Sequence, residues 1–228
     1  MNPHRVPWHY RARRAIILSI LRAVFRLLSK VKITGSENIP LGKPYIVAMN
    51  HVSIFDPPLA ASFWPEELEI IGAEEVFSRP GQGLVLKFYG VIRVHRGDYD
   101  RALLTKLIHI LKSGFPLLIA PEGSRSHVTA MNRAKPGIAY LIEQTGVPVV
   151  PVGIVGTTPD LMRRALKGPR PALEVRIGKP ITLPPIEVKG TERHEMRQKN
   201  ADLVMSHLAG LLPEEYWGAY AGSAIRPA

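Results

Sequence analysis

Residues 44–63 read PYIVAMNHVSIFDPPLAASF, and this stretch decides the fold because it joins a strand to a helix through a short polar loop. Residues 44–49 form an apolar run typical of a buried strand. Asp56 and Pro57 predict a helix start, with Asp56 as the N-cap and Pro57 at the first helical position. His51 and Asp56 therefore flank a tight connection and do not share a helix face.

A loop of this length can fold back and bring the Asp56 carboxylate onto one nitrogen of the His51 imidazole. The other nitrogen is then free to take a proton from a substrate hydroxyl, which is the core of a catalytic dyad. These residues also have a plainer interpretation. His51 would then be an ordinary polar loop residue, and Asp56 would serve as a helix cap.

Outward from this stretch, strands alternate with helices along the whole chain. We expect strands at 31–35, 44–49, 69–73, 90–96, 115–120, 147–155 and 172–178. We expect helices at 57–63, 83–89, 99–113, 136–145 and 192–212. Pro148 and Pro151 in the strand at 147–155 indicate either that this strand lies at a sheet edge or that the prolines lie at a strand end. The alternation predicts a single α/β domain whose sheet is mostly parallel or mixed and is flanked by helices.

Polar residues follow several of the expected strands. In α/β sheets, ligands bind beyond the carboxyl ends of the strands. His51, Arg96 and Glu122 would all emerge at that edge, so it is the predicted site.

The N-terminal segment, residues 1–32, holds most of the net charge of +11 and has no acidic residue. Its basic residues are Arg5, Arg11, Arg13, Arg14, Arg22, Arg26, Lys30 and Lys32. Apolar residues at helical spacing form one face, and Arg11, Arg14, Arg22, Arg26 and Lys30 fall on another. The apolar positions are Ile16, Ile17, Ile20, Leu21, Val24, Leu27, Leu28 and Val31.

This pattern is typical of a helix that lies in a membrane interface, with Trp8 and Tyr10 at its start. The charge-free run from residue 15 to 21 is too short to span a bilayer, and arginines argue against a cleaved signal peptide. An alternative is a helix packed on the protein's own core. Nucleic-acid binding is disfavoured because no aromatic-lined basic groove or recognition motif follows. We expect a membrane-associating helix at 1–32, a main domain at 33–215 and a tail at 216–228.

Composition narrows the class of protein further. The 228 residues fit one globular domain, with 46% hydrophobic and 21% charged residues. The absence of cysteine excludes disulfides, a thiol nucleophile and thiolate metal sites. No metal cluster has usable spacing, and no Gly-x-Ser-x-Gly elbow of a serine hydrolase is present.

Four blocks occur in the order found in a known family. They are NHVSIFD (50–56), GVIRVHRG (90–97), PEGSRS (121–126) and VPVVPVG (147–153). Together they resemble the glycerolipid acyltransferase family of the PlsC, or lysophosphatidate acyltransferase, type. The resemblance extends from about residue 33 to residue 155 and more loosely to about 215. It implies a glycerol-3-phosphate acyltransferase-like fold.

The resemblance also implies a reaction. A fatty acyl group passes from a thioester, acyl-CoA or acyl carrier protein, to the free hydroxyl of lysophosphatidic acid. His51 would be the general base, and Asp56 would fix its tautomer. Transfer would be direct, with no acyl-enzyme, cofactor or metal. We expect the enzyme to be peripheral or monotopic at an anionic membrane surface, on the cytoplasmic face.

By the same resemblance, the acceptor phosphate needs fixed cations, and Arg96, Arg125 and Lys135 are the candidates. Gly123 would let backbone N–H groups approach the ligand. The remaining candidates are Glu122, which could orient an arginine or the acceptor hydroxyl, and Ser124, which replaces the family's usual Thr. No block supplies clear oxyanion donors.

Alternatives remain at this stage. Arg93 and His95 depart from the family pattern in the second block, so the acceptor could be glycerol 3-phosphate, another lysophospholipid or a non-phosphorylated lipid. His127, close to the third block, is a rival base. A non-catalytic lipid-binding protein is a further possibility, although His51 and Asp56 are both present.

Overall fold

The computed structural model describes residues 3–95, 100–126 and 128–226. Within these ranges the strands are β1 (Lys30–Thr34), β2 (Ile46–Met49), β3 (Glu69–Ala73), β4 (Ile92–Val94), β5 (Leu117–Ile119), β6 (Val149–Val155) and β7 (Ala172–Ile177). The α-helices there are α1 (Trp8–Leu28), α2 (Asp56–Phe63), α3 (Gln82–Tyr89), α4 (Arg101–Lys112), α5 (Gly137–Thr145), α6 (Leu161–Lys167) and α7 (Gly190–Ala209).

The strands form one mixed sheet in the order β1-β7-β6-β2-β5-β3-β4. β7 runs parallel to β1 and antiparallel to β6, and each pairing from β6 through to β4 is parallel. The carboxyl ends of β2, β3, β5 and β6 therefore meet at one edge of the sheet. An α/β domain with a mixed sheet confirms the predicted fold class.

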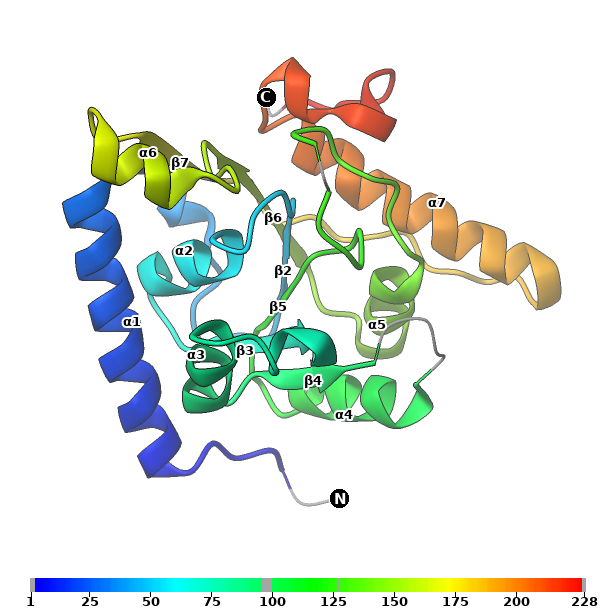
Figure 1. The fold of residues 1–228 in the computed structure, drawn as a ribbon. Coiled ribbons are helices and arrows are strands. Elements are labelled where there is room, and N and C mark those ends of the chain that lie inside the picture. The colour runs from blue at the N-terminus through cyan, green and yellow to red at the C-terminus, as the bar shows by residue number, and fades with distance from the viewer. Residues whose placement is uncertain (1–2, 96–99, 127, 227–228) are drawn as a thin grey trace.

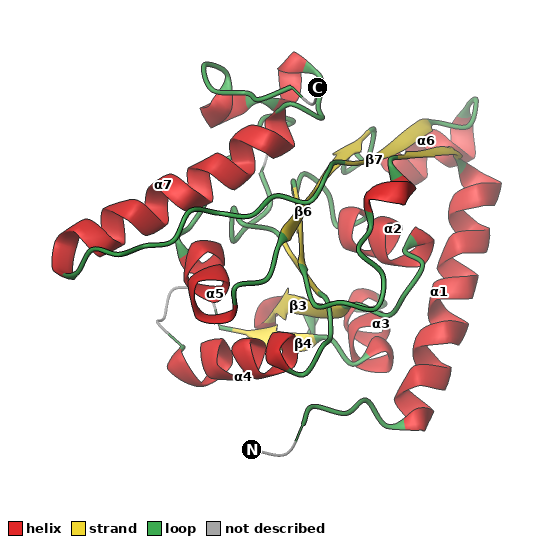
Figure 2. Ribbon diagram, turned by 180° about the vertical axis from the view of Figure 1, so that it is seen from behind, coloured by secondary structure: helices red, strands yellow, loops and turns green. Residues whose placement is uncertain are grey.

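Helices cover both faces of this sheet, with α1, α2 and α3 on one side and α4, α5 and α7 on the other (Figures 1 and 2). β2 shows why the sequence requires two layers, because its side chains alternate between two buried clusters. Ile46 and Ala48 pack towards the cluster beneath α4, α5 and α7. Val47 and Met49 pack towards the cluster beneath α1 and α2. A strand buried on both faces reads as a continuous apolar run, as residues 44–49 do.

Of the two positions that the prolines in 147–155 predicted, the sheet edge is wrong, because β6 lies inside the sheet between β2 and β7. The strand end is correct for Pro148. Pro148 comes just before the strand. Pro151 lies between the isolated bridge of Val149 with Ile181 and the first pair of the β6–β7 ladder, Val152 with Ile177. The antiparallel pairing is interrupted there, so the ladder does not need the N–H that proline lacks.

Helix α1 packs lengthwise against α2 and α3 (Figure 1). One expectation fails here, since Arg14 is buried and does not lie on an exposed charged face. Its guanidinium donates to both oxygens of Glu69, at 2.9 and 3.0 Å, and to the carbonyl oxygen of Tyr89 at 3.0 Å. A bidentate ion pair of this kind satisfies charges that burial would otherwise destabilise.

The other side of α1 remains exposed and partly apolar. Its large exposed side chains are Trp8, Ile16, Ile20, Val24 and Leu27. The inner face of the helix thus packs on the domain, as the alternative expectation has it, and its outer face is partly apolar. The position of the helix in a membrane interface stays a prediction. Within the described residues, no helix has the length and apolar character needed to cross a bilayer.

The helix α6 was absent from the sequence-based expectation. It follows β6 and contacts α1. The segment expected as a tail packs on the domain, since Tyr216 and Tyr220 are buried and the Tyr220 hydroxyl donates to Asp202.

Candidate active site

β2 ends at the centre of the sheet, and Asn50 fixes this end to β6. The Asn50 side chain is fully buried. Its amide nitrogen donates to the carbonyl oxygen of Ile154 at 2.9 Å, and its amide oxygen accepts from the Ile154 N–H at 2.7 Å. The side chain thus pairs with β6 as a peptide group would. The loop that carries His51 therefore starts from a fixed point.

His51 and Asp56 are brought together as the sequence predicts. His51 Nδ1 lies 3.1 Å from Asp56 Oδ2. A carboxylate only accepts hydrogen bonds, so Nδ1 carries the hydrogen and Nε2 keeps the lone pair in neutral His51. Asp56 is completely buried, while the His51 side chain is 15% exposed. The pair has the geometry of a general base and its orienting carboxylate.

The expected N-cap role of Asp56 is wrong. Asp56 is the first residue of α2, and Phe55 occupies the cap position without a side-chain cap bond. The Asp56 carboxylate turns back over the preceding loop, where Oδ2 also accepts from the N–H groups of Val52 at 2.7 Å and Ser53 at 2.6 Å. The first turn of α2 offers this carboxylate little to cap, because Pro57 and Pro58 have no N–H and the Leu59 N–H already donates to the Phe55 carbonyl oxygen. The carboxylate closes the loop instead.

Glu122 holds the His51 backbone from the neighbouring strand end. It follows β5, which pairs in parallel with β2. Its Oε1 accepts from the His51 N–H at 2.9 Å and its Oε2 accepts from the Asn132 N–H at 2.7 Å. The Ser126 N–H in turn donates to the His51 carbonyl oxygen at 2.8 Å. The 121–126 loop therefore fixes the peptide groups on both sides of His51.

Burial makes the Glu122 carboxyl a weaker acid than usual. Desolvation raises its pKa to about 7, and the nearby Asp56 charge acts in the same direction, while the two backbone N–H donors oppose the shift. Within this structure both oxygens of Glu122 hold loops together. Its predicted contact with substrate stays a prediction.

The other residues expected to bind the acceptor lie along the same edge. Gly123 and Arg125 line the same pocket as His51. Gly123 has φ +72°, and a Cβ atom there would lie 2.8 Å from Cδ of Lys135, so the exposed Lys135 chain passes directly over it. Ser124 is half-buried between them. Arg96 and His127 lie outside the described residues.

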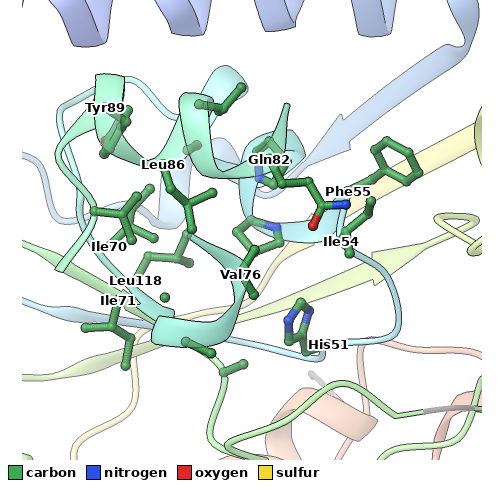
Figure 3. Close-up of a pocket in the computed structure, with 18 of the residues that line it drawn as sticks. His51, Ile54, Phe55, Ile70, Ile71, Val76, Gln82, Leu86, Tyr89 and Leu118 are labelled. Atoms are coloured by element: carbon green, nitrogen blue, oxygen red, sulfur yellow. The ribbon is translucent and has the colours of Figure 1, made fainter. Parts of the chain in front are cut away.

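A cavity of about 420 Å³ opens beside His51, and its wall is mostly apolar. Figure 3 shows His51 at one side of this pocket, with Ile70, Ile71 and Tyr89 at the other. α1 supplies Ile17, Leu18 and Leu21, and α3 supplies Val85 and Leu86. The lining comes from four separate stretches of the chain without a common motif, so the sequence did not reveal it.

Two further residues of the site were also missed. The backbone N–H of Asn132 donates to Glu122 Oε2. Thr157, in the loop after β6, donates its hydroxyl hydrogen to Asp56 Oδ1. The hydroxyl-bearing pair Thr157 and Thr158 after a strand at the predicted edge was the available signal. No group of three or more His, Cys, Asp or Glu within the described parts of the chain could hold a metal ion.

Comparisons with known proteins give one consistent result. A sequence model of the acyltransferase family matches residues 30–155. The 1-acyl-sn-glycerol-3-phosphate acyltransferase of Borreliella burgdorferi is 29% identical over 130 residues, covering 56% of this chain and 52% of that protein. The alpha form from Mus musculus is 25% identical over 177 residues, covering 76% and 60%. The chain thus covers less than two thirds of the length of these relatives.

Among solved structures, the fold resembles the 1-acyl-sn-glycerophosphate (LPA) acyltransferase PlsC from Thermotoga maritima. The TM-score is 0.61 with 28% sequence identity, over 85% of this chain and 80% of that one.

Proposed function

Because the chain belongs to the acyltransferase family, we propose that it transfers a fatty acyl group from a thioester to the free hydroxyl of lysophosphatidic acid. The product would be phosphatidic acid, a precursor of phospholipids. The relatives in Borreliella burgdorferi and Mus musculus carry the name of this activity.

The observation that carries the proposal is the position of the dyad at an apolar pocket. His51 lines the pocket, and its Nδ1 is held by Asp56. A proton acceptor beside an apolar cavity suits a reaction between a hydroxyl and a long-chain acyl thioester.

The reaction follows from the protonation state of the pair. His51 Nε2 takes the hydroxyl proton as the acceptor oxygen attacks the thioester carbonyl carbon. Asp56 stabilises the resulting imidazolium. When the tetrahedral intermediate collapses, the C–S bond breaks and the thiolate takes the proton from His51. The free thiol and the new ester leave, with no acyl-enzyme and no cofactor.

Cations beside the base support a phosphate-bearing acceptor. Arg125 lines the pocket near His51, and the Lys135 chain crosses Gly123. Arginine can donate two parallel hydrogen bonds to phosphate oxygens, and lysine adds a point charge. We assign Arg125 and Lys135 to the acceptor phosphate, with Arg96 as a third cation. The apolar wall would hold the acyl chain of the donor, acyl-CoA or acyl carrier protein.

Release of free thiol tests this function. The purified full chain, given acyl-CoA and lysophosphatidic acid, should release CoA, and His51→Ala should lower the rate about 10²- to 10⁴-fold, the usual contribution of a general base. His109→Ala on α4, across the sheet, is the matched control and should keep wild-type activity. Substantial turnover by His51→Ala would refute the dyad.

A panel of acceptors tests the substrate. Lysophosphatidic acid should react faster than glycerol 3-phosphate, other lysophospholipids and a monoacylglycerol. Arg125→Lys should raise KM for lysophosphatidic acid about 10-fold, because lysine cannot form the bidentate bond. A preference for the non-phosphorylated acceptor would overturn the assignment.

We also propose that the enzyme works at an anionic membrane surface, on the cytoplasmic face, and the outer surface of the domain supports lipid binding. Exposed apolar side chains occur on α1 (Ile16, Ile20, Leu27), α3 (Leu84, Phe88) and α6 (Met162, Leu166). Basic residues accompany them on each helix, at Arg13, Lys87 and Lys167. Apolar area combined with positive charge is what binds peripheral helices to anionic lipid.

Sedimentation with vesicles tests this partner. Deleting α1 would also remove a wall of the pocket, so substitutions on its outer face are the better experiment. The pair Ile16→Ser and Ile20→Ser should weaken binding to phosphatidylglycerol vesicles at least 10-fold, since each loses apolar burial. Leu41→Ser, an equally exposed position in the loop before β2, should have little effect. Equal binding by the double variant and wild type would contradict a membrane role for this face.

A further inference from the structure

Asp56 has an oxygen that the dyad itself does not use. Oδ2 faces His51 Nδ1 and the N–H groups of Val52 and Ser53. Oδ1 points the other way, towards the loop after β6, where it accepts from the Thr157 hydroxyl. This contact joins two side chains that lie 101 residues apart in the sequence.

The loop that carries Thr157 is fixed by contacts with other parts of the domain, so the Thr157 hydroxyl has a defined position. Its side chain is buried, with 2% relative exposure. The preceding Gly156 has φ +90°, and a Cβ there would lie 2.2 Å from the carbonyl oxygen of Ala172, so the chain passes close against β7. The Gly156 N–H donates to the Tyr216 hydroxyl at 3.0 Å, and Ile154 is paired with Asn50. The loop is therefore tied on several sides.

We propose that Thr157 is a positioning residue for the acyl transfer proposed above, in which its hydroxyl fixes the rotation of the Asp56 carboxylate and so keeps Oδ2 on His51 Nδ1. The inference rests on that proposed function. The terminal torsion of an aspartate is soft, with a broad energy profile, so contacts on both oxygens are needed to fix it.

The direction of the hydrogen bond supports this role. A carboxylate can only accept, so the hydrogen lies on Thr157 Oγ1, and a bond to a charged group is about twice as strong as a neutral one. Without this donor, Oδ1 would be a buried, unsatisfied charged oxygen. The carboxylate would then turn towards other donors, and the Nδ1–H tautomer of His51 would lose its preference.

The neighbouring threonine provides a matched control. The Thr158 hydroxyl donates to Asp160 Oδ1 at 2.6 Å and accepts from Arg164 Nη1 at 2.8 Å, so it is hydrogen-bonded without contacting the dyad side chains. Valine has nearly the shape of threonine and lacks the hydroxyl. Replacing each threonine in turn therefore separates the loss of a loop hydrogen bond from the loss of the bond to Asp56.

The first experiment measures turnover of acyl-CoA and lysophosphatidic acid by the full chain. Thr157→Val should lower kcat about 10- to 100-fold, the loss expected when a hydrogen bond to a buried charge is removed, with KM for both substrates within about twofold of wild type. Thr157→Ser keeps the hydroxyl and should restore most of the rate. Thr158→Val should have wild-type kcat. If Thr157→Val does not fold, Thr157→Ala against Thr157→Ser makes the same comparison.

The second experiment observes the histidine itself. In ¹⁵N spectra of histidine-labelled protein, the His51 signals are those that disappear in His51→Ala. Wild type and Thr158→Val should show the Nδ1–H tautomer, and Thr157→Val should gain the Nε2–H tautomer. Wild-type kcat and an unchanged tautomer in Thr157→Val would overturn the positioning role. Full activity of His51→Ala would instead refute the proposed function, so the two failures are distinguishable.

Discussion

Glu122 is a buried carboxyl with a raised pKa that also holds the loop carrying His51. Its two oxygens hold the N–H groups of His51 and Asn132, and burial raises its pKa to about 7. In the unfolded chain the pKa is near 4.3. The folded state therefore binds the proton more tightly than the unfolded state, so this group's contribution to stability falls as pH rises from about 4.5 to 7.

This linkage predicts a difference between wild type and Glu122→Gln, which cannot titrate there. Between pH 5 and pH 7.5, the free energy of unfolding of wild type relative to the variant should fall by up to about 3 kcal/mol. Urea unfolding at the two pH values measures it. Glu192→Gln, at an exposed position on α7, is the control. An equal difference at both pH values would show that Glu122 has an ordinary pKa.

At the residue scale, sequence reasoning succeeded where the contact is local. His51 and Asp56 are separated by five positions, and the loop between them is too short for many geometries. Thr157 and Asn132 could not be found in this way, because their contacts depend on which strand ends are neighbours. The N-cap interpretation of Asp56 failed because the loop N–H groups offer competing donors that a capping pattern does not include.

Among the elements, α1 was predicted correctly as a helix, but one residue assigned to its exposed charged face is buried. The arginine spacing indicated an exposed charged side, yet Arg14 pairs with Glu69 under the helix. Sequence periodicity cannot identify a buried cation, since its partner lies on a distant strand. α6 was missed for a related reason. Its seven residues are too few for a periodic pattern, and its place beside α1 comes from tertiary contact.

The buried pair predicts an asymmetric mutational response. Arg14→Met removes the cation that pairs with both oxygens of buried Glu69 and leaves its Oε1 the longer contact with His4 Nε2, at 3.3 Å. It should lower the free energy of unfolding by about 3–5 kcal/mol. Adding Glu69→Leu should recover part of this lost stability, because the double variant no longer buries an uncompensated charge. Urea unfolding of the four proteins in a double-mutant cycle measures the coupling. Arg13→Met, at the exposed neighbouring position, should change stability by less than about 0.5 kcal/mol. Additive effects of the two buried substitutions would contradict the pairing.

For the molecule as a whole, one helix contributes to two surfaces. The inner side of α1 lines the pocket with Ile17, Leu18 and Leu21, and its outer side exposes Ile16 and Ile20. Binary patterning showed that α1 is amphipathic. It could not show that some apolar residues of α1 line a pocket while others are exposed. That division depends on the space enclosed between α1, α3 and the sheet.

Filling the pocket from α1 should change the preference for acyl donors. Ile17→Trp adds volume inside the pocket, so a long acyl chain loses burial of several methylene groups, each worth about 0.8 kcal/mol. The ratio of kcat/KM for palmitoyl-CoA to that for octanoyl-CoA should fall at least 10-fold. Ile16→Trp, one position away on the outer face, should leave the ratio unchanged. Equal shifts in both variants would exclude this pocket as the acyl site.

The pairing of β1 with β7 has a consequence for how the chain folds. β1 forms one edge of the sheet and pairs with β7. The paired residues run from Lys30 opposite Ala172 to Thr34 opposite Arg176. During synthesis, β1 leaves the ribosome long before β7 exists, so closure of this pair must wait for most of the domain to be translated. Contacts between such distant positions slow folding and lengthen the time for which unpaired strands are exposed. The amphipathic helix ahead of β1 is then available to lipid before the domain that it will cover has closed.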